Sequence, residues 1–303
     1  MEPLISDQPK TKKTLRAHSP ASGRLLIILT ALLWGLAGVC VKSVTWSTMS
    51  IIATRNLISL VLLGGFRYAQ RKSLKLSFNR INVFGSLMMS ITGILYIGAI
   101  KLTTAGTAIV LQYIAPILVF LYTVIFKHKK PRLIEVLLTA AVFAGCVLSF
   151  ADSIDLTALL GNLLAILSGF SYAAQIILMN HPDGDSEDAS IISNGMSFLV
   201  CLPFMFFDSG LSFDAKNLFW IAVIGILQYG LANLLFAKGI QKTDAVEASL
   251  LLTIEPIFNP IPVMIFCGET MGFKSVIGFV IVIMSVTAYS VLSKKKAGNP
   301  EGK

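Results

Sequence analysis

The chain has 303 residues, of which 55% are hydrophobic and 14% are charged, whereas about 25% of the residues in an average soluble domain are charged. This composition indicates an integral membrane protein and excludes an ordinary soluble domain. The formal charge of +9 does not indicate a nucleic-acid partner, because the Lys and Arg residues lie between apolar runs rather than on one basic face interleaved with aromatic residues.

Ten apolar runs follow a polar N-terminal stretch. Residues 1–23 contain three prolines and a basic cluster, and we expect them to form a disordered cytoplasmic tail. Each run is close to the roughly 20 residues that a helix needs to cross a bilayer. The predicted helices span 24–42, 47–67, 81–101, 104–126, 132–150, 158–179, 189–207, 216–238, 244–267 and 272–292. The sequence therefore predicts an all-α integral membrane fold, closed by a cytoplasmic tail over 293–303.

The Lys and Arg residues between the runs predict the orientation, because positive residues in short loops stay in the cytoplasm. With the N-terminus inside, nearly all of them fall on the cytoplasmic side. Only Lys42, Lys101, Lys216 and Lys274 fall outside. We expect both termini to be cytoplasmic and the protein to reside in a cell membrane, specifically a prokaryotic plasma membrane.

One predicted cytoplasmic loop is acidic. It reads NHPDGDSEDAS and contains Asp183, Asp185, Glu187 and Asp188. The spacing of these residues does not fit an EF-hand. We interpret the loop as a solvated linker and the start of a helix.

An acidic residue lies in the middle of the ninth run. Glu255 is expected near the bilayer midplane, where a carboxylate is costly by roughly 2.5–3.5 kcal/mol. Pro256 cannot donate the helical hydrogen bond to the carbonyl of Leu252, so the helix should kink or open there. Transporters line binding sites with such broken turns. The alternative is that a neighbouring helix satisfies Glu255 by hydrogen bonding.

The fourth run resembles the ninth. Aligning Pro116 on Pro256 places TAGTAIVLQYIAPI over DAVEASLLLTIEPI, which indicates a duplication. The two runs are five apart, an odd number, so they must cross the membrane in opposite directions. Two five-helix halves, 24–150 and 158–292, would then form an inverted repeat with the substrate site at the midplane between them.

Arg55 is the second charge predicted inside the membrane. It lies about 12 Å below the outer face, and Glu255 lies about 14 Å below it, at 1.5 Å rise per residue. The two side chains either form a structural ion pair or receive the two ends of a zwitterionic solute.

Further candidates for contact with substrate are Gln112, Tyr113 and Trp34, because they lie on the repeated elements. Pro116 and Pro256 are expected to break the helices at this site. Other polar or aromatic residues at mid-span include Tyr96, Tyr172, Gln175, Gln228 and Asn233, some of which bond helix to helix. Glu247 lies one turn inside the cytoplasmic end, where we expect helix capping rather than proton coupling.

The sequence indicates neither a cofactor nor a metal site. The four cysteines, Cys40, Cys146, Cys201 and Cys267, lie in or beside apolar runs with no CxxC and no nearby His, as small buried residues do. No nucleotide-binding GxxxxGK[ST] motif occurs, so transport would draw on a gradient. The absence of an HExxH motif and of paired catalytic Asp residues argues against an enzyme.

The chain resembles the EamA-type permeases of the drug/metabolite transporter superfamily. The resemblance is carried by ALLWGLAGV with Trp34, RNLISLVLL with Arg55, TTAGTAIVLQYIAPI, and AVEASLLLTIEP running to Gly268 and Glu269. It implies ten helices in two domains and a carrier of amino acids, vitamins, nucleotide-like compounds or choline-type solutes. The first half has His128 and Lys129 where the family pattern has Gly-Glu, so we expect a structural role for Glu269.

These features predict a secondary transporter that moves a small amphipathic metabolite, amino-acid-like in character, by alternating access. The alternative is an importer of a vitamin-like or cationic solute, which would use Glu255 and aromatic residues rather than Arg55. A lipid flippase and an intramembrane enzyme are less favoured. The expected partners are a small-molecule substrate and the lipid bilayer; the sequence does not indicate the oligomeric state, the direction of transport or the coupling ion.

Overall fold

The computed structural model describes residues 20–73, 75–128, 132–149, 151, 157–259, 262 and 272–297. All regular secondary structure in these ranges is helical. Cys267, Gly268, Glu269 and Lys129 lie outside the described residues.

Helix occupies each of the ten apolar runs. In chain order the helices are α1 (Pro20–Trp34), α2 (Ala37–Ser43), α3 (Thr48–Ala69), α4 (Arg80–Leu102), α5 (Ala105–Gln112), α6 (Ala115–Ile125), α7 (Leu133–Ser149), α8 (Leu159–Met179), α9 (Ser186–Met205), α10 (Ala215–Val223), the π-helix η1 (Ile224–Leu231), α11 (Ala232–Ile240), α12 (Ala245–Leu251), α13 (Ile254–Phe258) and α15 (Phe273–Ala297). Seven continuous helical stretches of the described chain are long and apolar enough to cross a membrane, and α7 and α15 contain shorter apolar helices. The predicted all-α membrane class is confirmed, while the count of ten crossings stays a prediction.

The first and last helices reach into the stretches assigned to tails. Helix α1 begins at Pro20, four residues before the predicted start. A proline suits a first turn because its missing N–H would have no partner there. Helix α15 continues through the lysines at 294–296 to Ala297.

Two membrane runs are broken at equivalent places. Helix α5 ends at Gln112 and α6 begins at Ala115, while α12 ends at Leu251 and α13 begins at Ile254. Each new helix has a proline in its first turn, Pro116 or Pro256. The proline has no N–H to donate to the carbonyl four residues earlier, and its ring would clash with that carbonyl in a continuous helix. Both runs are thus interrupted next to the prolines singled out from the sequence.

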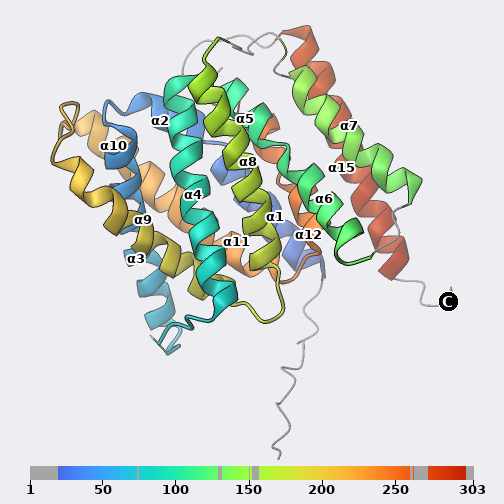
Figure 1. The fold of residues 1–303 in the computed structure, drawn as a ribbon, viewed down its shortest axis with the longest axis horizontal. Coiled ribbons are helices and arrows are strands. Elements are labelled where there is room, and N and C mark those ends of the chain that lie inside the picture. The colour runs from blue at the N-terminus through green and yellow to red at the C-terminus, as the bar shows by residue number, and fades with distance from the viewer. Residues whose placement is uncertain are drawn as a thin grey trace, which may run out of the picture.

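Pairs of helices from distant parts of the chain run side by side. Helix α4 packs along α8 and α1 packs along α11, while α3 lies beside α9 and α7 beside α15 (Figure 1). Large apolar side chains remain exposed along the outer faces, as in Leu163, Leu167 and Phe170 of α8. Continuous exposed apolar surface of this kind suits contact with lipid.

Close approach of α8 to the α5/α6 break requires a glycine. A Cβ atom on Gly169 would lie 2.6 Å from Cγ2 of Ile114 and 2.8 Å from the carbonyl oxygen of Gln112. Both distances are far below van der Waals contact, so this position admits no side chain without a backbone shift.

The acidic loop is more than a solvated linker, which corrects the prediction. Asp188 is 4% exposed; it forms an ion pair with Arg67 and accepts a hydrogen bond from the Ser77 amide at 2.8 Å. Beside it, the Lys72 Nζ lies 2.6 Å from the Glu187 carboxylate. The loop is acidic because it neutralises the basic α3–α4 connection. The predicted helix start is confirmed, since Asp185 caps α9.

A third ion pair forms at the same end of the bundle. The Arg24 Nε of α1 lies 2.6 Å from the Glu247 carboxylate of α12. The side chain that caps α12 is Asp244, which accepts from the Val246 amide at 3.0 Å. Glu247 therefore pairs with Arg24 in the first turn of α12 and is not the cap that the sequence suggested.

The opposite end is held by hydrogen bonds between the α2–α3 and α9–α10 connections. Helix α3 has 22 residues and so separates the two ends by about 33 Å. At the far end, Trp46 Nε1 donates to the Ser212 carbonyl at 2.8 Å and the Ser47 amide donates to Asp208 at 2.8 Å. Asp214 caps α10, and hydrogen bonds from the Ser212 hydroxyl and the Asn217 amide hold its pKa below the usual range.

Replacing Gly169 by Ala should lower the free energy of unfolding by about 1–3 kcal/mol, because the new methyl group overpacks the contact with the α5/α6 break. The matched control is Gly195→Ala on α9, where no atom lies within 4 Å of the added methyl group. That change should be neutral or stabilising by up to about 1 kcal/mol through helix propensity. Equal thermal unfolding midpoints in detergent for the two variants would contradict the close approach.

Replacing Asp188 by Asn should lower the free energy of unfolding by about 3 kcal/mol, because Arg67 keeps its charge in a largely buried place. The neighbouring Glu187→Gln variant removes a more exposed pair with Lys72 and should change it by less than about 1 kcal/mol. Denaturant titration in mixed micelles measures both. Two equal effects would show that Asp188 is no more buried in solution than Glu187.

Candidate functional site

A cavity of about 60 Å³ lies within the bundle, among the helices that carry the predicted site residues. This volume corresponds to about two water molecules. Its lining comprises Trp34, Arg55, Met89, Thr92, Gly93, Tyr96, Gln112, Tyr172, Gln175, Gln228, Tyr229, Asn233 and Glu255. Four of the five predicted substrate contacts, Trp34, Arg55, Gln112 and Glu255, thus lie around one cavity. The fifth, Tyr113, lies behind Glu255.

Arg55 is buried in the middle of α3 with 3% of its surface exposed. Its Cζ lies 4.1 Å from the ring centroid of Tyr229, in cation–π contact. Gly93 of α4 makes room for the guanidinium, since a Cβ there would lie 2.8 Å from Nη2. Among the described residues, no carboxylate forms an ion pair with Arg55, and its Nε has no hydrogen-bond partner.

Glu255 is held at the α12/α13 break, with 4% of its surface exposed. The Tyr113 hydroxyl, at the α5/α6 break, donates to the Leu252 carbonyl at 2.7 Å and lies 3.1 Å from Glu255 Oε2. The same carbonyl also accepts from the Glu255 amide at 2.9 Å. The Leu252 carbonyl, to which Pro256 cannot donate a hydrogen bond, thus accepts one from Tyr113, a side chain 139 residues earlier in the chain.

Arg55 and Glu255 line the same cavity without touching. Of the two roles considered for them, the structural ion pair is not formed in this conformation. Glu255 does have one interhelical hydrogen-bond partner, Tyr113, as the structural alternative required. Glu255 thus both contacts Tyr113 and lines the cavity.

A third break positions Trp34. Helix α1 ends at Trp34 and α2 begins at Ala37, and the carbonyl of Gly35 in between accepts a hydrogen bond from Asn259 Nδ2 at 2.8 Å. This bond joins the α1/α2 break to the segment that follows Glu255. The Trp34 ring packs against Tyr172 and Phe236, with centroids 6.1 and 5.1 Å away.

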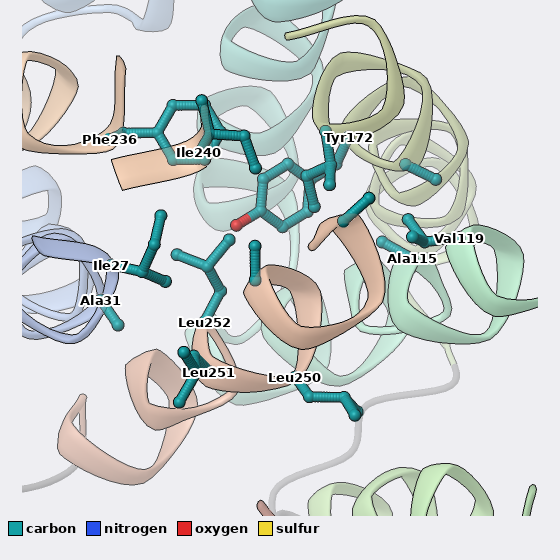
Figure 2. Close-up of a cluster of buried hydrophobic side chains, with 14 of the residues drawn as sticks. Ile27, Ala31, Ala115, Val119, Tyr172, Phe236, Ile240, Leu250, Leu251 and Leu252 are labelled. Atoms are coloured by element: carbon teal, nitrogen blue, oxygen red, sulfur yellow. The ribbon is translucent and has the colours of Figure 1, made fainter. Parts of the chain in front are cut away.

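Unpartnered polar atoms gather at the cavity. Within the described chain, eleven buried side-chain nitrogen or oxygen atoms have no hydrogen-bond partner, and seven of them belong to lining residues. The seven are Trp34 Nε1, Arg55 Nε, the hydroxyls of Tyr96 and Tyr172, Gln228 Oε1, and both amide atoms of Asn233. In Figure 2 the Tyr172 hydroxyl points from α8 toward Leu252 at the α12/α13 break. Each buried orphan costs about 1–3 kcal/mol, so their concentration in one place suits a polar ligand.

Tyr229 and Gly93 were not among the residues singled out from the sequence. Tyr229 lies in the π-helix η1, whose wider turn makes Gln228, Tyr229 and Gly230 consecutive buried residues. Wide turns of this kind are frequent at functional sites. The sequence signal is the pair of glycines, Gly225 and Gly230, that flanks the tyrosine, but glycines in a membrane helix are equally typical of close helix packing.

The described residues contain no group of three or more His, Cys, Asp or Glu that could hold a metal ion. Cys40, Cys146 and Cys201 are buried free thiols. The residues that line the cavity offer charge, hydrogen-bonding groups and aromatic surfaces to a bound molecule.

Replacing Tyr113 by Phe should lower the free energy of unfolding by about 1 kcal/mol, because the buried Leu252 carbonyl loses one of its two donors. Tyr122→Phe is the matched control: it removes a hydroxyl from the adjacent helix α6, and its ring stacking on Phe126 is kept. We expect it to change stability by less than about 0.5 kcal/mol. Equal unfolding midpoints for the two variants would exclude the bond to Leu252.

Known proteins resemble this chain along nearly its whole length. It is 23% identical over 299 residues to YicL of Salmonella typhimurium, which is named an uncharacterized inner membrane transporter. The aligned region covers 92% of this chain and 98% of YicL. An uncharacterized transporter of Archaeoglobus fulgidus is 23% identical, with 87% of this chain and 94% of that one covered. A solved crystal structure with 16% identity superposes with a TM-score of 0.78, covering 90% of this chain and 99% of that one, and so shares the fold.

A family model matches the chain twice, over residues 21–151 and 159–291, and describes the EamA-like transporter family. These matches confirm the resemblance seen in the Trp34, Arg55 and Glu255 segments. They agree with the apolar helices in identifying a multi-pass membrane protein. The chain belongs to the EamA-like transporter family.

Proposed function

We propose that the protein is a secondary carrier that moves a small amphipathic solute, amino-acid-like in character, across the cell membrane by alternating access. The observation that carries this proposal is the cavity in which one buried cation, Arg55, and one buried acid, Glu255, face a shared space without pairing. A membrane protein that used these charges only for structure would be expected to pair them, because each is expensive alone.

The proposed solute follows from the groups that line the cavity. A guanidinium binds a carboxylate through two parallel hydrogen bonds, so Arg55 suits the acidic end of a zwitterion. Glu255 suits an ammonium group. The amides of Gln228 and Asn233 offer donors and acceptors between the two charges, and Trp34 offers an apolar face.

The size of the cavity supports alternating access. About 60 Å³ is far below the roughly 300–1,000 Å³ of small-molecule sites. An amino-acid-sized solute therefore enters only if the surrounding helices separate. The cavity in this conformation corresponds to a contracted stage of the proposed cycle.

The helix pairing supports an inverted repeat of two five-helix halves. If the first half corresponds to the second, α1 corresponds to α8, and α4 corresponds to the α10–η1–α11 run. The contact of α1 with α11 is then the symmetry mate of the contact of α4 with α8. The pairs α3 with α9 and α7 with α15 each join corresponding helices, as elements near a two-fold axis do. In this arrangement the site lies between the halves.

The orientation with both termini in the cytoplasm is part of the proposal. The ion pairs Arg67–Asp188 and Arg24–Glu247 lie at the end that the distribution of positive residues assigns to the inside. The Arg67–Asp188 pair joins the acidic loop to the basic α3–α4 connection, which is consistent with a cytoplasmic position for both.

A cationic or vitamin-like solute is the second candidate, and the aromatic lining favours it. Trp34, Tyr96 and Tyr172 offer aromatic rings, whose faces attract a cation, near Glu255. The face of Tyr229, however, is already occupied by Arg55. The same Arg55 would repel a solute that carries only positive charge.

The test is thermal stabilisation of the purified protein by a panel of L-amino acids, choline and thiamine. A solute at about a hundred times its dissociation constant stabilises the folded protein by about 2.7 kcal/mol. We expect an amino acid to stabilise the wild type, and Arg55→Gln and Glu255→Gln to lose most of that shift.

The controls are Arg71→Gln and Glu187→Gln, which remove the same charges at the end of the bundle and should keep the shift. Stabilisation by choline that survives Arg55→Gln would favour the cationic solute. If a solute shifts all variants equally, the two buried charges are structural and the site lies elsewhere.

A further inference from the structure

We propose that Glu255 carries a proton in this conformation, and that the cationic group of the solute displaces it, so that the carrier exchanges solute for H⁺. The inference rests on the proposed function for the solute, but the proton itself is argued from the contacts of Glu255 alone.

The first argument is a count of hydrogens. The Tyr113 hydroxyl has one hydrogen, yet its oxygen lies 2.7 Å from the Leu252 carbonyl and 3.1 Å from Glu255 Oε2. The carbonyl has no hydrogen to give, so the shorter contact takes the tyrosine hydrogen. The longer contact is then a full hydrogen bond only if the Glu255 carboxyl donates to the tyrosine oxygen. A carboxylate would have to share the single tyrosine hydrogen with the Leu252 carbonyl in a weaker three-centre hydrogen bond.

The second argument is that no cation among the described residues forms an ion pair with Glu255. Glu255 is 4% exposed, and the titratable groups that share its cavity are the phenols of Tyr96, Tyr172 and Tyr229 and the guanidinium of Arg55, which does not pair with it.

Within the described ranges, no cation of the helices that pack against α13 forms an ion pair with Glu255. These helices are α1, α5, α7 and α15. Arg24 of α1 pairs with Glu247, and α7 and α15 contribute the buried Cys146 and Tyr289 to the same core. Glu135 and Lys274 lie in the first turns of α7 and α15. A buried acid without a paired cation takes up a proton rather than bear the cost of an isolated charge.

The exchange step balances in atoms and charge. When an ammonium group approaches Glu255, the carboxyl O–H bond breaks and the proton leaves to water on the side to which the cavity is open. The negative charge that remains on the carboxylate pairs with the ammonium. Release of the solute on the other side reverses the step, and one proton returns to Glu255. Solute and proton therefore cross in opposite directions.

The proton is tested without any solute, by infrared spectroscopy of the wild type in lipid nanodiscs at neutral pH. We expect a carbonyl band of a protonated carboxyl group that disappears in Glu255→Gln and shifts to higher wavenumber in Tyr113→Phe. Glu247→Gln is the matched control and should leave the band in place, because Glu247 forms an ion pair with Arg24 and lies outside the cavity. A wild-type spectrum with no band that responds to Glu255→Gln overturns the proposal.

The displacement is tested with L-amino acids and their N-acetyl derivatives, which keep the carboxylate and lack the ammonium group. In weakly buffered solution with a pH-sensitive dye, an amino acid that stabilises the wild type should release one proton per molecule bound. Its N-acetyl derivative should release none, and Glu255→Gln should release none with either. Binding of the amino acid without proton release overturns the exchange and leaves the carrier function standing. If no member of the panel binds, the carrier proposal and the exchange both fail, while the infrared band still decides the proton.

Discussion

The site depends on the hydrogen bond from the Tyr113 hydroxyl to the Leu252 carbonyl. Pro256 cannot donate the helical hydrogen bond to that carbonyl, and Tyr113 supplies a second donor beside the Glu255 amide. The partner comes from the equivalent break in the other half of the chain. One bond therefore ties the two interrupted runs together and fixes Glu255, three residues beyond Leu252, at the edge of the cavity.

The sequence was sufficient to locate the helices and the two buried charges. Apolar runs of about 20 residues have one inexpensive conformation in lipid, so the ranges around Arg55 and Glu255 follow from composition alone. The breaks beside Pro116 and Pro256 follow equally directly, because proline removes a particular helical bond. Counting residues from the helix ends placed both charges at similar depth, which is consistent with their shared cavity.

The remaining features depend on packing, which a single sequence does not encode locally. The π-helix that brings Tyr229 over Arg55 costs backbone hydrogen-bond geometry and forms only where neighbouring helices support it. The role of Asp188 depended on knowing that Arg67 lies beside it in space, 121 residues away in sequence. Similarly, only the close approach of α8 to the α5/α6 break explains why position 169 is glycine.

The breaks are duplicated, but the charges are not. Ala115 occupies the place in the first half that Glu255 has in the second. When Ser47 and Asp185, the caps of α3 and α9, are aligned, Ser193 falls opposite Arg55, and Asn56 falls opposite Asn194. A homodimer of one half would hold each charge twice, at two places related by its two-fold axis. In the proposed inverted repeat, each half then supplies a charge that the other half lacks, Arg55 from the first and Glu255 from the second.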